Sequence, residues 1–127
     1  MRRPPPPTAQ VNNDGALDLF VANGNKHGSE LWMNDGPGKT SFTASVAPVQ
    51  DLPAESLAIS FGDVSGDGWV DLFVANAAGH SNKLWINTGT GNFTLSESGG
   101  PAGTATVSVD SRASAFADIN NDGKLDL

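Results

Sequence analysis

The sequence predicts an all-β protein, and its composition is the first reason. The 127 residues include 15 glycines and 8 prolines, and only 17% of the residues are charged. Such a chain is rich in turn formers and poor in the glutamate and lysine that helical bundles need. No segment repeats its apolar residues every 3.6 positions, as an amphipathic helix would. We therefore expect short strands joined by many turns.

An internal repeat is the second reason. When residues 10–39 are placed on residues 63–92, 15 of the 30 aligned pairs are identical, and the match resumes further along with a period of 53 to 55 residues. The repeat predicts four regions: a Pro-rich leader at 1–9 that is disordered, blade repeat 1 at 10–62, blade repeat 2 at 63–117, and the start of a truncated third repeat at 118–127.

Each repeat contains four short apolar segments that are typical of strands. In the first repeat they cover residues 19–22, 31–33, a segment starting at 42, and 56–62; in the second they cover 72–75, 84–86, a segment starting at 93, and 111–117. Residues 19–22 and 72–75 are apolar at every position, which is typical of strands buried between two layers. Residues 56–62 alternate large with small side chains, and the small ones would let a neighbouring sheet approach closely.

Four strands in every period predict a β-propeller fragment of about two four-stranded blades. A single β-sandwich is the alternative. It gives no reason, however, for the chain to repeat its acidic loops in register.

The charge of the chain is concentrated in three loops. The net charge of -7 argues against a nucleic-acid partner, whose binding depends on lysine and arginine. Eight of the 14 acidic residues lie in loop 1 (residues 10–18), loop 2 (63–71) and loop 3 (118–126). The chain has no cysteine, so any metal is held by oxygen. No apolar stretch approaches the ~18 residues of a membrane span, so we expect no membrane insertion.

The loops share a pattern that suits a hard cation. Side chains that carry oxygen recur at positions 1, 3, 5 and 9 of the nine, and glycine stands at position 6, where it permits a sharp turn. Ca²⁺ takes six to eight oxygen ligands, and a carbonyl at position 7 can complete such a shell. The alternative is a set of Asp-Gly turns whose side chains only cap the local backbone. Such turns do not require the acid at position 9, and clustered carboxylates without a cation repel one another.

The motif F-x-D-x-x-x-D-G-x-x-D-L-F-V-A-N, followed by L-W-x-N-x-G-x-G, resembles the FG-GAP or VCBS-type repeats of integrin-α-like β-propellers. The resemblance covers residues 10–127 and implies a structural Ca²⁺ in each blade loop. The implied ligands are Asp63, Ser65, Asp67, Asp71 and the Trp69 carbonyl in loop 2; Asp118, Asn120, Asp122, Asp126 and the Lys124 carbonyl in loop 3; and Asn12, Asp14, Asp18 and the Ala16 carbonyl in loop 1. Gln10 replaces the first acid of loop 1, so we expect that loop to bind most weakly.

The resemblance also implies a function. It predicts a non-enzymatic module for adhesion or ligand binding, located outside the cell or at its surface, with a protein or carbohydrate ligand. A lectin-like propeller and an accessory domain of a secreted hydrolase or lyase are the alternatives. Further blades of the same chain are the expected neighbours. Self-association is the less favoured interpretation, because residues 10–19 and 118–127 would duplicate one another in a ring of copies.

Three tryptophans complete the predictions. Trp32 and Trp85 lie in the middle of strands and are expected in the core. Trp69 alternates with the loop ligands, so it is the best candidate for stacking on a ligand, although packing against a neighbouring element is the more common role of such a residue.

Overall fold

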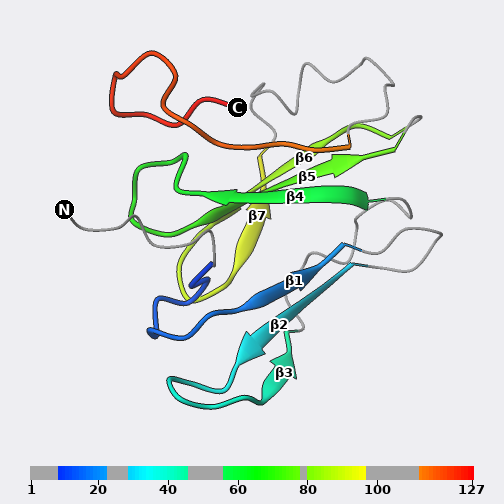
Figure 1. Cartoon of the computed structure of the whole chain (residues 1–127), viewed down its shortest axis with the longest axis vertical. Coiled ribbons are helices and arrows are strands. Elements are labelled where there is room, and N and C mark those ends of the chain that lie inside the picture. The colour runs from blue at the N-terminus through cyan, green and yellow to red at the C-terminus, as the bar shows by residue number, and fades with distance from the viewer. Residues whose placement is uncertain (1–8, 23–28, 46–55, 78–79, 97–111) are drawn as a thin grey trace.

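The protein consists of two antiparallel sheets, described by a computed structural model over residues 9–22, 29–45, 56–77, 80–96 and 112–127. The first sheet has the order β1 (Leu19–Val21), β2 (Glu30–Asn34), β3 (Phe42–Ala44). The second has the order β4 (Ser56–Gly62), β5 (Asp71–Asn76), β6 (Lys83–Asn87), β7 (Phe93–Leu95). Figure 1 shows the two sheets stacked, with residues 112–127 crossing above the second. The prediction of an all-β fold is confirmed. The predictions for residues 1–8 lie outside the described residues.

The sheets begin one strand earlier than the repeats that the sequence comparison defines. Strand β4 stands at the end of blade repeat 1 in the sequence, but it pairs with β5, with Phe61 opposite Leu72 and Ser60 opposite Phe73. Loop 2 is the hairpin connection between these two strands. The sequence period therefore starts at a loop, whereas the sheet starts with the strand before it.

Each sheet has two faces, which we name by their direction along the chain. The forward face points toward the next repeat: it carries Phe20, Leu31 and Met33 in the first sheet, and Phe73, Leu84 and Ile86 in the second. The backward face points toward the preceding repeat: it carries Leu19, Val21, Trp32 and Phe42 in the first sheet, and Leu72, Val74, Trp85 and Phe93 in the second. The strand registers place the members of each set on the same side of their sheet.

The main core lies where the forward face of the first sheet meets the backward face of the second. Its buried members come from both sheets and from loop 1, and they are Ala9, Val11, Phe20, Leu31, Leu72, Val74, Trp85 and Phe93. Phe20 and Phe61 meet edge to face, with ring centroids 6.5 Å apart. Unlike faces thus meet in this core, which is the contact of stacked repeats. Two sheets that close on each other as a sandwich would bring like inner faces together.

A second core lies on the forward face of the second sheet, under residues 112–127. Phe73, Ala75 and Leu84 are buried there, and the ring of Phe116 meets Phe73 edge to face at 6.3 Å. Strand β5 is accordingly buried along its whole length. The predicted burial between two layers is confirmed for β5. In the first sheet, by contrast, Leu19 keeps an exposed fraction of 49%.

Residues 112–117 differ from the prediction. The sequence predicts a strand over 111–117, but residues 112–116 form none; only Ala117 makes an isolated bridge, with Asp126. Strand β4 obtains its ladder from β5, and this segment has no such neighbour among the described residues. The small residues of β4 do allow a close approach, but by this segment and not by the predicted sheet: a Cβ on Gly62 would lie 2.8 Å from side-chain atoms of Phe116 and Leu125.

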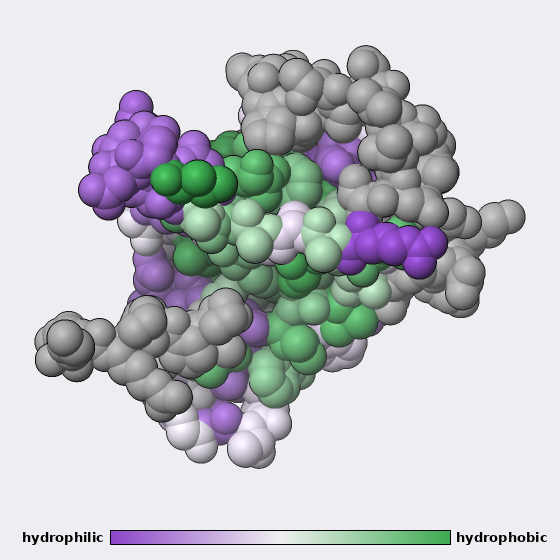
Figure 2. Space-filling model, turned by 45° about the horizontal axis from the view of Figure 1, so that its top comes forward, coloured by the Kyte–Doolittle hydropathy of each residue, from purple (hydrophilic) through white to green (hydrophobic). Residues whose placement is uncertain are grey.

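Apolar surface remains outside the two cores. Figure 2 shows a band of it across the middle of the molecule, flanked by hydrophilic loops. In the described part of the chain, no helix is long and apolar enough to span a membrane.

Candidate functional site

The three acidic loops have one backbone shape. The residue at position 4 takes a left-handed conformation in each loop, with φ of 55° at Asn13, 75° at Gly66 and 59° at Asn121. The glycine at position 6 does the same, with φ between 85° and 90° in all three loops. Asparagine and glycine are the residues that adopt this conformation at least cost. The predicted role of the position 6 glycine, a sharp turn, is confirmed.

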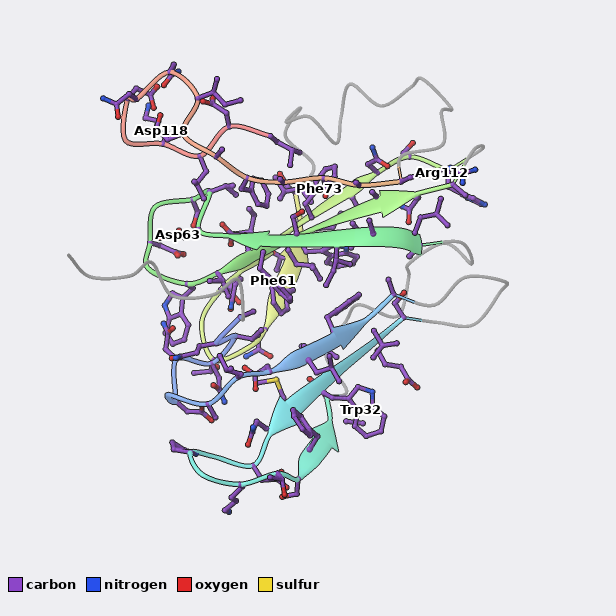
Figure 3. The ribbon with its side chains drawn as sticks, in the orientation of Figure 1. Trp32, Phe61, Asp63, Phe73, Arg112 and Asp118 are labelled. Atoms are coloured by element: carbon purple, nitrogen blue, oxygen red, sulfur yellow. The ribbon has the colours of Figure 1, made fainter. Side chains whose placement is uncertain are left out.

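The acid at position 1 accepts hydrogen bonds from the backbone N–H groups of its own loop. In loop 2 the Asp63 carboxylate accepts hydrogen bonds from the N–H groups of Gly66 at 2.8 Å, Asp67 at 3.1 Å and Gly68 at 2.8 Å. In loop 3 Asp118 accepts from the N–H groups at the matching positions 5 and 6. Figure 3 shows the two carboxylates in neighbouring loops at the same end of the molecule. The position 1 acid therefore shapes the turn.

The acid at position 9 ties the loop to the sheet. Asp71 is fully buried, and its Oδ2 accepts from the N–H groups of Val64 at 2.9 Å and Ser65 at 3.0 Å. Its Oδ1 accepts from the N–H of Asn87, at the end of β6, at 2.9 Å. Asp18 makes the same connection in loop 1, from Val11 to Asn34.

Asp126 makes only the first half of this connection among the described residues. Its Oδ2 accepts from the N–H of Ile119 at 3.0 Å. The counterpart of Asn87 for this repeat is not among the described residues.

The side chains at positions 3 and 5 complete the loop shape. In loop 1 the Asn12 side chain bonds Asp14 through both its amide nitrogen and its oxygen. Asn120 and Asp122 do the same in loop 3. Asp67 accepts the N–H of Trp69 at 2.9 Å through Oδ1. The position 5 acid in each loop bonds the N–H two residues on, the Asx turn that aspartate favours.

Asn87 is a residue that sequence reasoning missed. Its side chain is fully buried, and its Nδ2 donates to the carbonyls of Val11 at 2.8 Å and Val70 at 3.1 Å. Its Oδ1 accepts from Gly89 in the next turn. A side chain in the second sheet thus holds both loop 1 and loop 2. The signal was present in the sequence, as the asparagine repeated in L-W-x-N.

Burial makes the carboxylate of Asp71 electrostatically unfavourable. Desolvation raises its pKa above the ordinary value for an aspartate, and the three backbone N–H donors lower that pKa only in part. The neighbouring charge of Asp67 raises the pKa of Asp71 further. A cation near these two acids would relieve both the desolvation and the repulsion.

The loops have the oxygen donors that Ca²⁺ prefers, but their side chains do not converge on one point. Each donor set is made of oxygens and suits a hard cation. Within the described residues, however, no three Asp, Glu or His side chains converge as metal ligands. The carboxylates at positions 1 and 9 point at backbone N–H groups. Binding of Ca²⁺ would therefore require the position 1 and position 5 carboxylates to turn toward one point, with the position 9 acid keeping its backbone bonds.

Trp69 covers a turn. A Cβ on Gly89, in the connection between β6 and β7, would lie 3.6 Å from the Trp69 ring. The ring is half-buried. Trp69 therefore packs against a neighbouring element, which is the alternative to stacking on a ligand.

The stacked sheets and the repeated loops define a repeat module of β-propeller type. A family model for the FG-GAP-like repeat matches the chain twice, over residues 10–74 and 63–127. Together the matches span nearly the whole chain, and the chain belongs to the FG-GAP-like repeat family. Both matches begin at the first position of an acidic loop. No curated protein and no solved structure matches this chain.

Proposed function

We propose that this protein is a non-enzymatic repeat module, located outside the cell or at its surface, whose loops bind Ca²⁺ and whose stacked sheets support adhesion or ligand binding. The observation that carries the proposal is the recurrence of one acidic loop, with one backbone shape, in all three repeats. A turn needs one capping acid, whereas loops 2 and 3 each carry three carboxylates within nine residues.

The metal has a physical role in this proposal. Loop 2 holds a buried carboxylate, Asp71, beside the charge of Asp67, and that arrangement opposes folding. Ca²⁺ bound by the folded loop and not by the unfolded chain stabilises the fold by mass action, by about 2.7 kcal/mol at a concentration 100 times Kd. Because the position 9 acid joins the loop to β6, this stabilisation reaches the sheet. The ion is structural, since a full shell of protein oxygens leaves no position for a substrate.

Asp67 is the residue whose change tests the metal most cleanly. Asp67→Asn removes one charge, and the asparagine oxygen can still accept the N–H of Trp69. The matched control is Asp35→Asn, the same change in the turn between β2 and β3, outside the loops. Thermal unfolding is measured for both variants and the unchanged chain, in EDTA, in Ca²⁺ and in Mg²⁺.

We expect Ca²⁺ to raise the Tm of the unchanged chain, and Mg²⁺ to raise it less because Mg²⁺ requires a smaller octahedral shell. Asp67→Asn should lose the part of this gain that belongs to loop 2, and Asp35→Asn should keep all of it. If Ca²⁺ leaves the Tm of all three proteins unchanged, the loops are turns without metal and the proposal fails.

A further inference from the structure

Loop 1 contacts loop 2 through the side chain of Asn13. The Nδ2 of Asn13 donates to the carbonyl of Gly68 at 3.2 Å, and the two residues stand 55 positions apart in the chain. Asn13 is at position 4 of its loop and Gly68 is at position 6 of the next loop. A side chain from one repeat therefore holds the backbone of the loop in the following repeat.

The backbone is held on both sides of Trp69. The carbonyl of Gly68 accepts from Asn13, and the N–H of the same peptide group, which belongs to Trp69, donates to Asp67 Oδ1 at 2.9 Å. The carbonyl of Val70 accepts from Nδ2 of Asn87 at 3.1 Å. The Trp69 carbonyl, at position 7 of loop 2, thus lies between two peptide groups that are both held by hydrogen bonds.

A buried contact already fixes where loop 1 lies relative to loop 2. Asn87, which is fully buried, also donates to the carbonyl of Val11 at 2.8 Å. The two loops are therefore joined in the core through Asn87 and at the surface through Asn13, which is exposed. Loss of the surface contact should change loop 2 without separating the two repeats.

Position 4 of the three loops shows that the asparagine is not needed for the turn alone. Asn13, Gly66 and Asn121 all have a left-handed φ, of 55°, 75° and 59°. Glycine adopts this conformation most easily, so it meets the backbone requirement by itself in loop 2. The side chain of Asn121 makes no hydrogen bond among the described residues. The amide of Asn13 thus has a contact that its counterparts lack.

We propose that loop 1 positions loop 2, with Asn13 as a positioning residue that holds the peptide group between Gly68 and Trp69 and, next to it, the Trp69 carbonyl. This role does not require a cation in loop 1. Loop 1 has Gln10 at position 1 and two carboxylates, whereas loops 2 and 3 have three each. The loop with the poorest set of acids is the one that supports its neighbour.

A consequence for cation binding rests on the function proposed above. The Trp69 carbonyl is the backbone ligand expected for loop 2, and a group that is held in place before binding loses less freedom when it binds. Loss of the Asn13 amide should therefore weaken the binding of a cation by loop 2.

Amide hydrogen exchange of the full chain in EDTA tests the positioning role without a cation. Asn13→Gly removes the amide and keeps a residue that accepts a left-handed φ. The N–H of Trp69 should exchange about threefold faster, as expected for the loss of one exposed hydrogen bond. The N–H of Lys124, which makes the matching bond in loop 3, should be unchanged. Asn121→Gly is the matched control and should leave the Trp69 N–H unchanged.

A second pair of variants separates the lost donor from the added freedom of glycine. Asn13→Asp keeps the size of the side chain, but an ionised carboxylate cannot donate to the Gly68 carbonyl. It should speed the exchange of the Trp69 N–H at least as much as Asn13→Gly does, and Asn121→Asp should not. Equal exchange of the Trp69 N–H in the Asn13 and Asn121 variants would overturn the proposal, whether or not a cation binds.

Terbium luminescence excited through tryptophan tests the consequence for cation binding, because Trp69 is the one tryptophan of three that lies in an acidic loop. Asn13→Gly should raise the Tb³⁺ Kd of loop 2 about threefold, and Asn121→Gly should leave it unchanged. Faster exchange with an unchanged Kd would overturn the role of Asn13 toward the Trp69 carbonyl. The exchange difference without any response to Tb³⁺ or Ca²⁺ would support the positioning role and refute the proposed function.

Discussion

Trp32 and Trp85 occupy the same position in two copies of one repeat, yet Trp85 has an exposed fraction of 5% and Trp32 is half-buried at the surface. Phe42 and Phe93 differ in the same way, at 40% and 2%. The local sequence around each pair is nearly the same, so it does not decide the difference. What decides it is whether a preceding sheet covers the backward face. In this fold a residue becomes part of the core through the neighbouring repeat.

The largest effect that follows from this comparison concerns the two tryptophans. Trp85→Ala should lower the free energy of unfolding by about 3–5 kcal/mol, because it leaves a cavity between the sheets. Trp32→Ala should lower it by only about 1 kcal/mol, because the half-buried Trp32 is not enclosed between two sheets. Urea unfolding of both variants, at concentrations where the chain is monomeric, measures the difference. Equal losses would contradict the assignment of the core.

Asn87 and Asn34 form the next pair. Asn87→Ala should cost about 1–3 kcal/mol, because the buried carbonyls of Val11 and Val70 lose their donor. Asn34 is half-buried; its N–H donates to Asp18 and its side-chain oxygen accepts from the N–H of Gly36, both in its own repeat. Asn34→Ala should therefore cost less. Urea unfolding again gives the comparison, and a larger loss for Asn34→Ala would mean that Asn87 does not join the repeats.

Gly62 tests the contact between β4 and the third repeat. Gly62→Ala places a methyl group 2.8 Å from atoms of Phe116 and Leu125, so we expect a loss of about 1–3 kcal/mol through overpacking. Gly66→Ala is the contrast, since a Cβ there meets no atom within 4 Å and the cost comes from its left-handed φ of 75° alone. Near-ultraviolet circular dichroism should report a changed Phe116 environment only for Gly62→Ala. The same spectral change in both variants would place residues 112–127 elsewhere.

The smallest effect is a dependence on pH. Burial raises the folded-state pKa of Asp71 above the unfolded value, so the contribution of this residue is most favourable at low pH and is lost as the pH rises through the folded pKa. In EDTA, the unchanged chain should therefore gain stability relative to Asp71→Asn as the pH falls through the folded pKa toward the ordinary value for an aspartate. A difference between the two proteins that stays constant over this range would show that Asp71 is not desolvated.

The repeat, the strands of the two sheets and the two-layer burial of β5 could be predicted from the sequence, because each depends on a local pattern that occurs more than once. It placed β4 in the preceding repeat, since a period read along the chain does not say which neighbour a strand pairs with. It expected a strand over 111–117 because the residues match β4, although a strand also needs a partner. It expected Trp32 in the core because the sequence of β2 carries no sign that its backward face is uncovered.

The acidic loops show a second limit. Their nine-residue pattern and their sharp turns follow from residue type and spacing. The connection made by Asp71 does not, because Asn87 stands 16 residues away and meets it only once β5 and β6 have paired. The metal ligands in the three loops remain predictions. The Tm comparison of Asp67→Asn with Asp35→Asn addresses them directly.

Amide hydrogen exchange tests the central claim most directly, which is that each sheet is stabilised by its neighbours in the stack. At concentrations where the chain is monomeric, the amides of β5 from Leu72 to Ala75 should exchange at least ~100-fold more slowly than those of β1 from Leu19 to Val21, because β5 is paired on both sides and covered on both faces. Equal protection of the two strands would contradict the account.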